Sequence, residues 1–271
     1  MLHNYYIWGL YNCMIIASIT SWKGRINTLG FTLFCFLAKQ TLRPNKIVLT
    51  LSSEEFPNGQ QDLPTDLQRV IVAFNIKVLW SANNIFSHKK YEVFRYYPNE
   101  YCVILDDDIL YPSDYIYNLY HTSLKFPHTV ICYRSQTVDY NRGQLIKLPF
   151  NPNPNHKNLL YSGLSMFPPN TFPQESFHYT NIRDKVVPRC DDSWVKAWLI
   201  KSGTKISAIN EFTPHCIIDI PNTQEQSIWS LYNSKRNANG ITTKYINMIN
   251  VCNALQIHHI AMQIWPNLFN I

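Results

Sequence analysis

The chain has 271 residues, of which 46% are hydrophobic and only 15% are charged, so it can bury a large core and is not globally disordered. Its net charge of +6 favours phosphate-bearing ligands or an anionic membrane surface as partners. The seven cysteines are an odd number without a CxxC pair, which argues against a disulfide framework or a zinc site and predicts reduced thiols.

The N-terminal stretch 1–20 lacks a basic region and a small-residue cleavage site, so it is expected to lead into the first strand and not to act as a signal peptide. No run of 18 or more apolar residues occurs, so no transmembrane helix is expected. These features predict a cytoplasmic protein.

Short β-rich apolar runs alternate with longer apolar-periodic runs in the first part of the chain. The expected strands are 14–20, 46–51, 76–80 and 101–105, and the expected helices between them are 26–40, 66–74 and 86–97. This alternation predicts a parallel sheet of the nucleotide-binding type. Neither GxGxxG after the first strand nor a P-loop is present, so dehydrogenase and P-loop kinase interpretations lose their main support.

The second part of the chain continues the alternation less regularly. A helix is expected at 113–126, a strand at 129–133, a long loop at 143–164, a short apolar stretch at 164–167, a helix from Asp191 to Lys201, a strand at 205–209 and a helical segment at 221–271. The predicted fold class is therefore α/β, with a mixed, mostly parallel central sheet flanked by helices and a helical C-terminal segment.

The central motif is the apolar run Tyr101–Leu105, which continues directly into Asp106, Asp107 and Asp108. Ligands of open α/β sheets bind at the carboxyl ends of strands. Three adjacent carboxylates repel one another, so a cation is needed among them, and Mg²⁺ or Mn²⁺ suits their oxygen atoms. The alternative is an ordinary acidic turn.

A second acidic pair, Asp191 and Asp192, lies about 80 residues later and begins a predicted helix. Acids at a helix N-terminus are favourable through capping and the helix dipole, so ordinary capping is one interpretation. A functional role for the pair is the alternative.

These motifs together resemble bacterial, inverting, family-2-like nucleotide-sugar glycosyltransferases of the GT-A fold, which build capsule or lipopolysaccharide glycans. The resemblance covers about residues 13–210 and is carried by 18–21 with Arg25, by the triplet followed by Tyr111-Pro112, and by 191–194. It implies one domain, 1–271, with a nucleotide-sugar-binding half at 12–112, an acceptor half at 113–220 and a helical C-terminal segment at 221–271.

For the donor, the resemblance implies a nucleotide-sugar, expected to be a UDP-sugar, held with Mn²⁺ or Mg²⁺. Asp106 and Asp108 occupy the Asp-x-Asp positions, where one contacts the ribose and the other holds the metal. His215 is either a further metal ligand or a structural histidine. The nucleotide-sugar-binding residues are expected to be Thr20, Ser21, Arg25, Lys89, Lys90, Asp106 and Asp107. For the two lysines, a solvated helix face is the alternative.

For the acceptor, the resemblance implies a glycan or lipid-linked oligosaccharide, with no nucleic acid as partner. Asp192 is expected to be the general base, and Asp191 its neighbour or the helix cap. Tyr161, Trp194 and Trp229 either stack on sugars or pack in the core. A peripheral contact with the inner face of the cell membrane is expected from the apolar content of 257–271, with packing of that segment on the core as the alternative.

Two departures from the family pattern and two rival functions remain open. There is no clear basic pair near the C-terminus to hold a diphosphate, and the loop 161–165 has only one glycine. A haloacid-dehalogenase-type phosphohydrolase also places Asp-x-Asp after an apolar strand, although there it is the first strand and here the fourth. A metal-dependent carbohydrate-binding module is the non-enzymatic alternative.

Overall fold

The computed structural model describes residues 13–141, 144–178, 180–211, 217–227, 231–232, 234–237 and 241–270. Their centre is a seven-stranded sheet in the order β10-β6-β9-β4-β1-β2-β3. The strands are β1 (Ile15–Thr20), β2 (Lys46–Ser52), β3 (Lys77–Ser81), β4 (Tyr101–Leu105), β6 (Val130–Ser135), β9 (Leu164–Phe167) and β10 (Ile206–Glu211). Only β9 runs antiparallel to its neighbours β4 and β6. The predicted α/β fold class with a mixed, mostly parallel sheet is confirmed.

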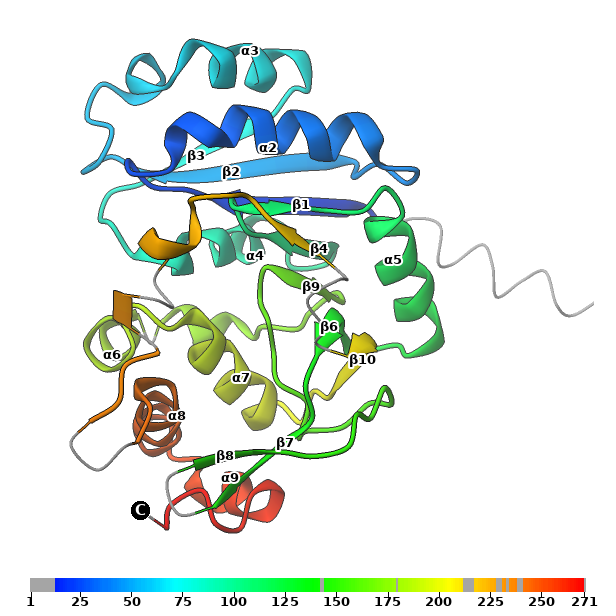
Figure 1. The fold of residues 1–271 in the computed structure, drawn as a ribbon, viewed down its shortest axis with the longest axis vertical. Helices are drawn as coiled ribbons and strands as arrows, with labels where there is room; N and C mark the ends of the chain where they lie inside the picture. Colours follow the sequence, from blue (N-terminus) through cyan, green and yellow to red (C-terminus); the bar gives the residue numbers. More distant parts are fainter. Residues whose placement is uncertain are drawn as a thin grey trace, which may run out of the picture.

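The sheet is covered by helices on both faces, because side chains alternate between two cores along its apolar strands (Figure 1). Ile15, Ala17 and Ile19 of β1 belong to one core, and Ile16 belongs to the other. The helices are α2 (Ile26–Lys39), α3 (Thr65–Ala73), α4 (Val93–Tyr96), α5 (Tyr115–Lys125), α6 (Thr180–Val186), α7 (Asp191–Lys201), α8 (Thr243–Ala254) and α9 (His258–Ile264), with 3₁₀ turns η1 (Gly59–Asp62), η2 (Phe86–Tyr91), η3 (Gln174–Phe177) and η4 (Gln224–Gln226).

Two local predictions were wrong in detail. The expected helix 86–97 is divided into η2 and α4, and Phe86 at its start has a φ of 51°, which no regular right-handed helix allows. The expected loop 143–164 contains β8 (Gln144–Lys147), which forms an antiparallel pair with β7 (Val138–Asn141). All four residues of β8 are exposed, so β8 lacks the alternation of buried and exposed residues that identifies a strand in a sequence.

The C-terminal segment contributes α8 and α9, while the described residues between 217 and 242 are mostly irregular apart from η4 and β11 (Ile218–Asp219), which pairs with β5 (Ile109–Leu110). Trp265 and Leu268 are fully buried, so the apolar residues that motivated a membrane contact pack largely in the core. Among the described residues, no helix is long and apolar enough to cross a membrane.

Candidate functional site

The acidic triplet lies at the carboxyl end of β4, in the middle of the sheet. β4 is flanked by β1 on one side and by the antiparallel β9 on the other. Both β1 and β4 end at this edge, so Thr20 at the end of β1 and Ser21 directly after it lie near the triplet. The sheet thus brings together residues that are more than 80 positions apart in the sequence.

Arg25 is the cation that holds the second and third acids of the triplet. Its guanidinium forms ion pairs with Asp108 and, at 3.0 Å, with Asp107. Ser21 Oγ also donates a hydrogen bond to Asp107 Oδ2 at 2.5 Å. Burial nevertheless raises the pKa of Asp107 to about 6, against the opposing effect of Arg25. Asp107 is thus a buried, internally partnered group.

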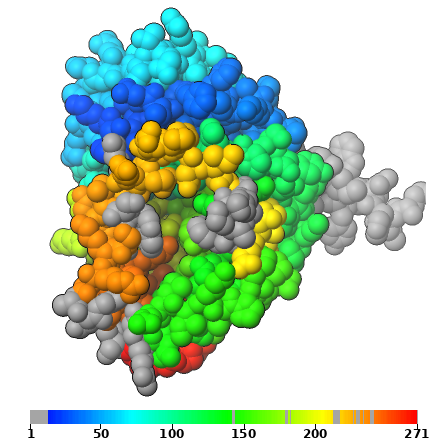
Figure 2. Space-filling view, viewed as in Figure 1, coloured from blue at the N-terminus to red at the C-terminus, as the bar shows by residue number. Residues whose placement is uncertain are grey.

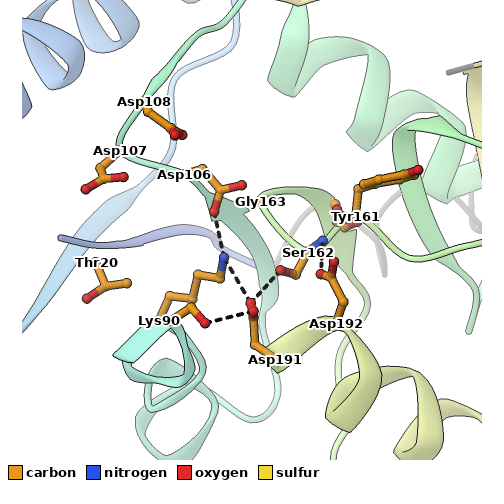
Figure 3. Close-up of polar contacts among 12 residues, drawn as sticks. Thr20, Lys90, Asp106, Asp107, Asp108, Tyr161, Ser162, Gly163, Asp191 and Asp192 are labelled. Atoms are coloured by element: carbon orange, nitrogen blue, oxygen red, sulfur yellow. Dashed lines mark hydrogen bonds and ion pairs between the residues drawn. The ribbon is translucent and has the colours of Figure 1, made fainter. Parts of the chain in front are cut away.

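Lys90 joins the triplet to the second acidic pair. Its Nζ lies 2.6 Å from Asp106 Oδ1 and 3.1 Å from Asp191 Oδ2 (Figure 3). Burial alone would lower the pKa of Lys90, but the two carboxylates raise it above its usual range. Lys89 is equally buried and pairs with Glu55 at 3.1 Å. The solvated-face interpretation of these lysines is therefore wrong, because η2 packs them inside the protein.

Asp106 lies against the backbone of Gly163. A Cβ atom at position 163 would be 1.8 Å from Asp106 Oδ2, so any side chain there would displace the carboxylate. Tyr111 fixes the same loop, since its hydroxyl donates to Gly163 O at 2.8 Å and accepts from Asp106 N at 2.7 Å. Gly163, the single glycine of the loop 161–165, is therefore required for the close approach of the Asp106 carboxylate.

Asp191 is surrounded by donors at the start of α7. Ser87 Oγ donates to its Oδ1 at 2.8 Å, while Ser162 Oγ donates to its Oδ2 at 2.7 Å. Burial would raise its pKa, but Lys90 and these hydrogen bonds hold the pKa well below its usual range. A carboxylate kept ionised in this way is a poor proton acceptor but a good electrostatic anchor.

Asp192 is more exposed and belongs to a different set of contacts. Ser162 N donates to its Oδ1 at 3.0 Å, and Lys244 Nζ of α8 lies 3.2 Å from its Oδ2. Its side chain is 25% exposed, against 13% for Asp191. Of the two acids, Asp192 is the one better placed to meet a substrate.

Both acidic groups line one large cavity of about 730 Å³. Asp106, Asp108, Asp191 and Asp192 are all in its wall, together with Lys90 and residues of β6, β7, β8 and α8. The segment 217–227 lies across the front of the molecule, above a hollow in its surface (Figure 2). A smaller cavity of about 180 Å³ shares the walls formed by Arg25, Ser87, Lys90 and Asp106.

All seven residues expected to bind the nucleotide-sugar line the smaller cavity. Its wall contains Thr20, Ser21, Arg25, Lys89, Lys90, Asp106 and Asp107. Thr20 Oγ1 itself donates to Thr50 O at 2.7 Å. Two of the expected residues, His215 and Trp229, lie outside the described residues.

The structure adds residues that the sequence did not single out. Lys244 pairs with Asp192, Gln224 Nε2 donates to Asp108 Oδ2 at 3.0 Å, and Ser162 donates to both members of the second acidic pair. Lys244 and Arg236 also line the large cavity, so the C-terminal region does contribute basic residues to the site. No short motif marks these positions, and only their placement in the fold reveals them. The third aromatic residue considered, Trp194, is largely buried and packs edge-on against Trp198.

Comparison with family models finds no match, and comparison with curated proteins finds none either. Among solved structures, the chain is similar to CMP:2-keto-3-deoxy-manno-octonic acid synthetase complexed with CTP. The identity is 12% and the TM-score 0.45, over 79% of this chain and 95% of that one. At these values the likeness carries no argument about activity, and the functional assignment rests on the geometry described above.

Proposed function

We propose that the chain is a metal-dependent glycosyltransferase that moves a sugar from a nucleotide-sugar, a UDP-sugar by the resemblance, to a hydroxyl of a glycan or lipid-linked acceptor. The observation that carries the proposal is the shared cavity. It brings Asp106 and Asp108 from the end of β4 into one wall with Asp192 from the start of α7. Its volume of about 730 Å³ falls in the range of small-molecule sites.

The chemistry of the carboxylates fits Mn²⁺ or Mg²⁺ bound together with a diphosphate. Asp106 and Asp108 both face the large cavity, and Gly163 leaves the space that Asp106 occupies. Within the described ranges, no three His, Cys, Asp or Glu side chains are grouped as a complete metal site. Two carboxylates completed by substrate phosphates and water are the usual protein arrangement for Mg²⁺. Such a metal supplies Lewis-acid stabilisation of the leaving diphosphate.

The chain's own residues divide the remaining tasks. Arg25 and Lys90 add positive charge beside the carboxylates, where the phosphates of a donor would lie. Asp192 would take the proton of the acceptor hydroxyl as that oxygen attacks the anomeric carbon, which inverts the configuration. Asp191 stays ionised between Lys90 and its serine donors and holds the loop that contains Ser162 in place.

Neither alternative function gains support from a specific contact. A haloacid-dehalogenase-type phosphohydrolase also has a later acidic pair, but its Asp-x-Asp follows the first strand, whereas here it follows β4, the fourth strand of the chain. A carbohydrate-binding module would not need the small cavity beside β1. An assay with a generic aryl phosphate distinguishes the first alternative, since a phosphohydrolase would cleave it and the proposed transferase would not.

The direct test is the thermal stability of the protein with UDP. A ligand that binds only the folded state raises its apparent stability, so UDP with Mn²⁺ should raise Tm and UDP with a chelator should raise it much less. Asp108→Asn, which removes one charge and keeps the shape, should reduce the metal-dependent part. Asp139→Asn is the matched control, because Asp139 pairs with Lys157 outside both cavities. Equal stabilisation with and without the metal would overturn the proposed metal dependence.

A further inference from the structure

The helices α2, α3 and α5 form one layer over a single face of the central sheet, because their buried side chains belong to the same core. α2 contacts α3 through the edge-on rings of Phe34 and Phe74, whose centroids are 6.3 Å apart. The end of α2 is joined to the start of α5 by a hydrogen bond of 2.8 Å from Thr41 N to Ser113 O. The sides of the three helices that point away from the core therefore share one outer face of the molecule (Figure 1).

The exposed stripe of α2 on this outer face is mostly apolar. Asn27, Phe31, Phe34 and Ala38 recur every three or four residues and are all exposed, so they follow one side of the helix. Phe31 is 57% exposed and Phe34 is 53% exposed. The solvent-facing side of a surface helix is normally charged or polar, yet Lys39 is the only charged residue of α2. The exposed phenylalanines therefore call for a binding partner.

The neighbouring helices add apolar and aromatic side chains to the same face. Val72 of α3 is 76% exposed and Tyr117 of α5 is 46% exposed. The Tyr117 ring packs against His121 one turn later, with 4.1 Å between the ring centroids. No residue of α2, α3 or α5 lines either of the two cavities described above. The catalytic site proposed above thus does not account for these exposed side chains.

The charged groups of the outer face are mostly positive. Its exposed cations are Lys39, Arg43, Arg69 and Lys125. None of the four forms an ion pair with any residue that the structure describes. Asp66 is the single acidic residue within the three helices. It is turned toward α2, since a Cβ atom at Gly30 would be 2.7 Å from Asp66 Oδ2.

We propose that this outer face binds the surface of an anionic lipid bilayer. Exposed apolar side chains between basic ones suit the interfacial region of a bilayer, where Phe31 and Phe34 would enter the layer below the headgroups. The long stems of lysine and arginine let their charged ends reach the anionic headgroups from the flanks of the helices. This contact differs from the one expected at 257–271, and it does not depend on the proposed transfer reaction.

Two other occupants fit the outer face less well. A second copy of the same face would place these four cations opposite four more, and like charges across an interface are unfavourable. A nucleic acid would offer phosphates to the cations, but its backbone provides no apolar layer for the two phenylalanines. A bilayer with anionic lipids supplies both the charge and the apolar layer.

The test is co-sedimentation of the full chain with vesicles at low salt. Vesicles of phosphatidylcholine alone are compared with vesicles of phosphatidylcholine and phosphatidylglycerol in equal parts. The protein should bind the mixed vesicles at least about tenfold more tightly, because each cation near an anionic surface adds to the attraction. Raising the salt concentration should weaken this binding, since salt screens exposed charges.

Variants place the contact on the outer face. The double variant Phe31→Gln/Phe34→Gln should weaken binding to the mixed vesicles about tenfold or more, because it removes the side chains that enter the bilayer. Both side chains are more than half exposed, so the fold should persist, and Tm is measured to check it. Lys39→Gln and Arg43→Gln should each weaken the binding about fivefold, and they test the same face without changing an apolar residue.

Two matched controls lie elsewhere on the surface. Met262→Gln removes an apolar side chain that is 45% exposed on α9, within the segment 257–271. Lys147→Gln removes an exposed cation of β8 that pairs with Glu211 at 2.8 Å. Neither substitution should change binding to the mixed vesicles.

Equal binding to both kinds of vesicle, or no binding at low salt, would overturn the inference. So would binding that survives the phenylalanine and cation substitutions, or that Met262→Gln weakens as much as they do. Sedimentation velocity without lipid tests the second copy as occupant. A dimer that Phe31→Gln/Phe34→Gln abolishes, in a chain that does not bind vesicles, would assign the face to self-association instead.

Discussion

The acidic triplet and the second acidic pair come from different elements but share one arrangement of buried and more exposed acids. In the triplet, Asp107 is buried between Ser21 and Arg25, while Asp106 and Asp108 face the large cavity. In the second pair, Asp191 accepts from two serines and Lys90, while Asp192 is the more exposed member. Each group thus contains one anchored acid and at least one that is available to a ligand.

The comparison teaches that sequence neighbours in an acidic cluster need not share a role. All five acids pair with a cation of the protein, but Asp107 and Asp191 are the least exposed members of their groups, so their substitution should act mainly on folding. The acids that face the cavity should act mainly on ligands. Lys90 contacts one acid of each group and so ties the two together.

The largest expected effect follows from exchanging the acids of the second pair. Asp192→Asn keeps the size of the side chain but cannot take a proton, so the transfer rate should fall by about 10²–10⁴-fold while the affinity for the donor persists. Asp191→Asn should instead lower stability, because Lys90 and Asp106 lose part of a buried network. Transfer rate, donor affinity and urea unfolding are measured for both variants.

Asp139→Asn again serves as the control, with no expected change in rate. Near-normal turnover of Asp192→Asn would show that this acid is not the base. A dead Asp191→Asn variant of normal stability, beside an active Asp192→Asn variant, would show that the two roles are exchanged.

The substitution Lys90→Met tests whether the ion pairs of Lys90 hold the triplet and the second acidic pair together. The side chain of Lys90 is 4% exposed, and removal of its ammonium leaves Asp106 and Asp191 facing each other without their shared cation. Breaking a buried ion pair in this way costs about 3–5 kcal/mol, and the lower end applies here because Asp106 is 36% exposed. The free energy of unfolding in urea gives the value.

Lys147→Met is the comparison for that measurement, since the exposed pair of Lys147 with Glu211 should contribute less than about 1 kcal/mol. If the two substitutions lower stability equally, Lys90 does not hold the acidic groups together.

The smallest expected effect concerns the pH dependence of the anchored acid of the triplet. Burial raises the pKa of Asp107 to about 6, above the value of about 3.9 for an unfolded chain. The folded state therefore binds this proton more tightly, and the stability it contributes is present below about pH 4 and lost as the pH rises through 6. Asp107→Asn should remove this loss, which is about 2 kcal/mol between pH 4.5 and pH 7.

Urea unfolding at pH 4.5 and pH 7 measures the difference between the two proteins. Asp191 acts in the opposite sense, because its pKa is lowered, so its contribution is lost as the pH falls below about 4. If wild type and Asp107→Asn show the same pH slope between 4.5 and 7, Asp107 is not a buried group of raised pKa.

Much of the fold follows from the sequence because its strands are strongly apolar and well separated. β1, β2 and β4 are buried along almost their whole length, and the predicted bounds differ from the observed ones by a residue or two. The β7–β8 pair was not predicted, because its second strand is entirely exposed and carries no pattern of burial. Short segments held by neighbours, such as η2, likewise depend on tertiary packing more than on local preference.

The site was predictable where charges are adjacent in the sequence and not where they meet only in space. Asp106–Asp108 and Asp191–Asp192 are visible as clusters, and the structure places both around one cavity. Lys244, Gln224 and Ser162 are single polar residues that belong to no charge cluster, and their contacts span 29 to 116 positions. No local rule of charge or periodicity connects residues so distant.

Gly163 has a consequence for recognising related chains. Its φ is not in the left-handed region that usually requires glycine. Glycine is needed here because the carboxylate of Asp106 occupies the space that a side chain would fill. Nineteen of the twenty amino acids are thus excluded by one neighbour. In a structural superposition, a glycine at this position therefore indicates that the first acid of the triplet can adopt the orientation of Asp106 seen here. Any other residue indicates a different orientation of that carboxylate, even where the acidic motifs are alike.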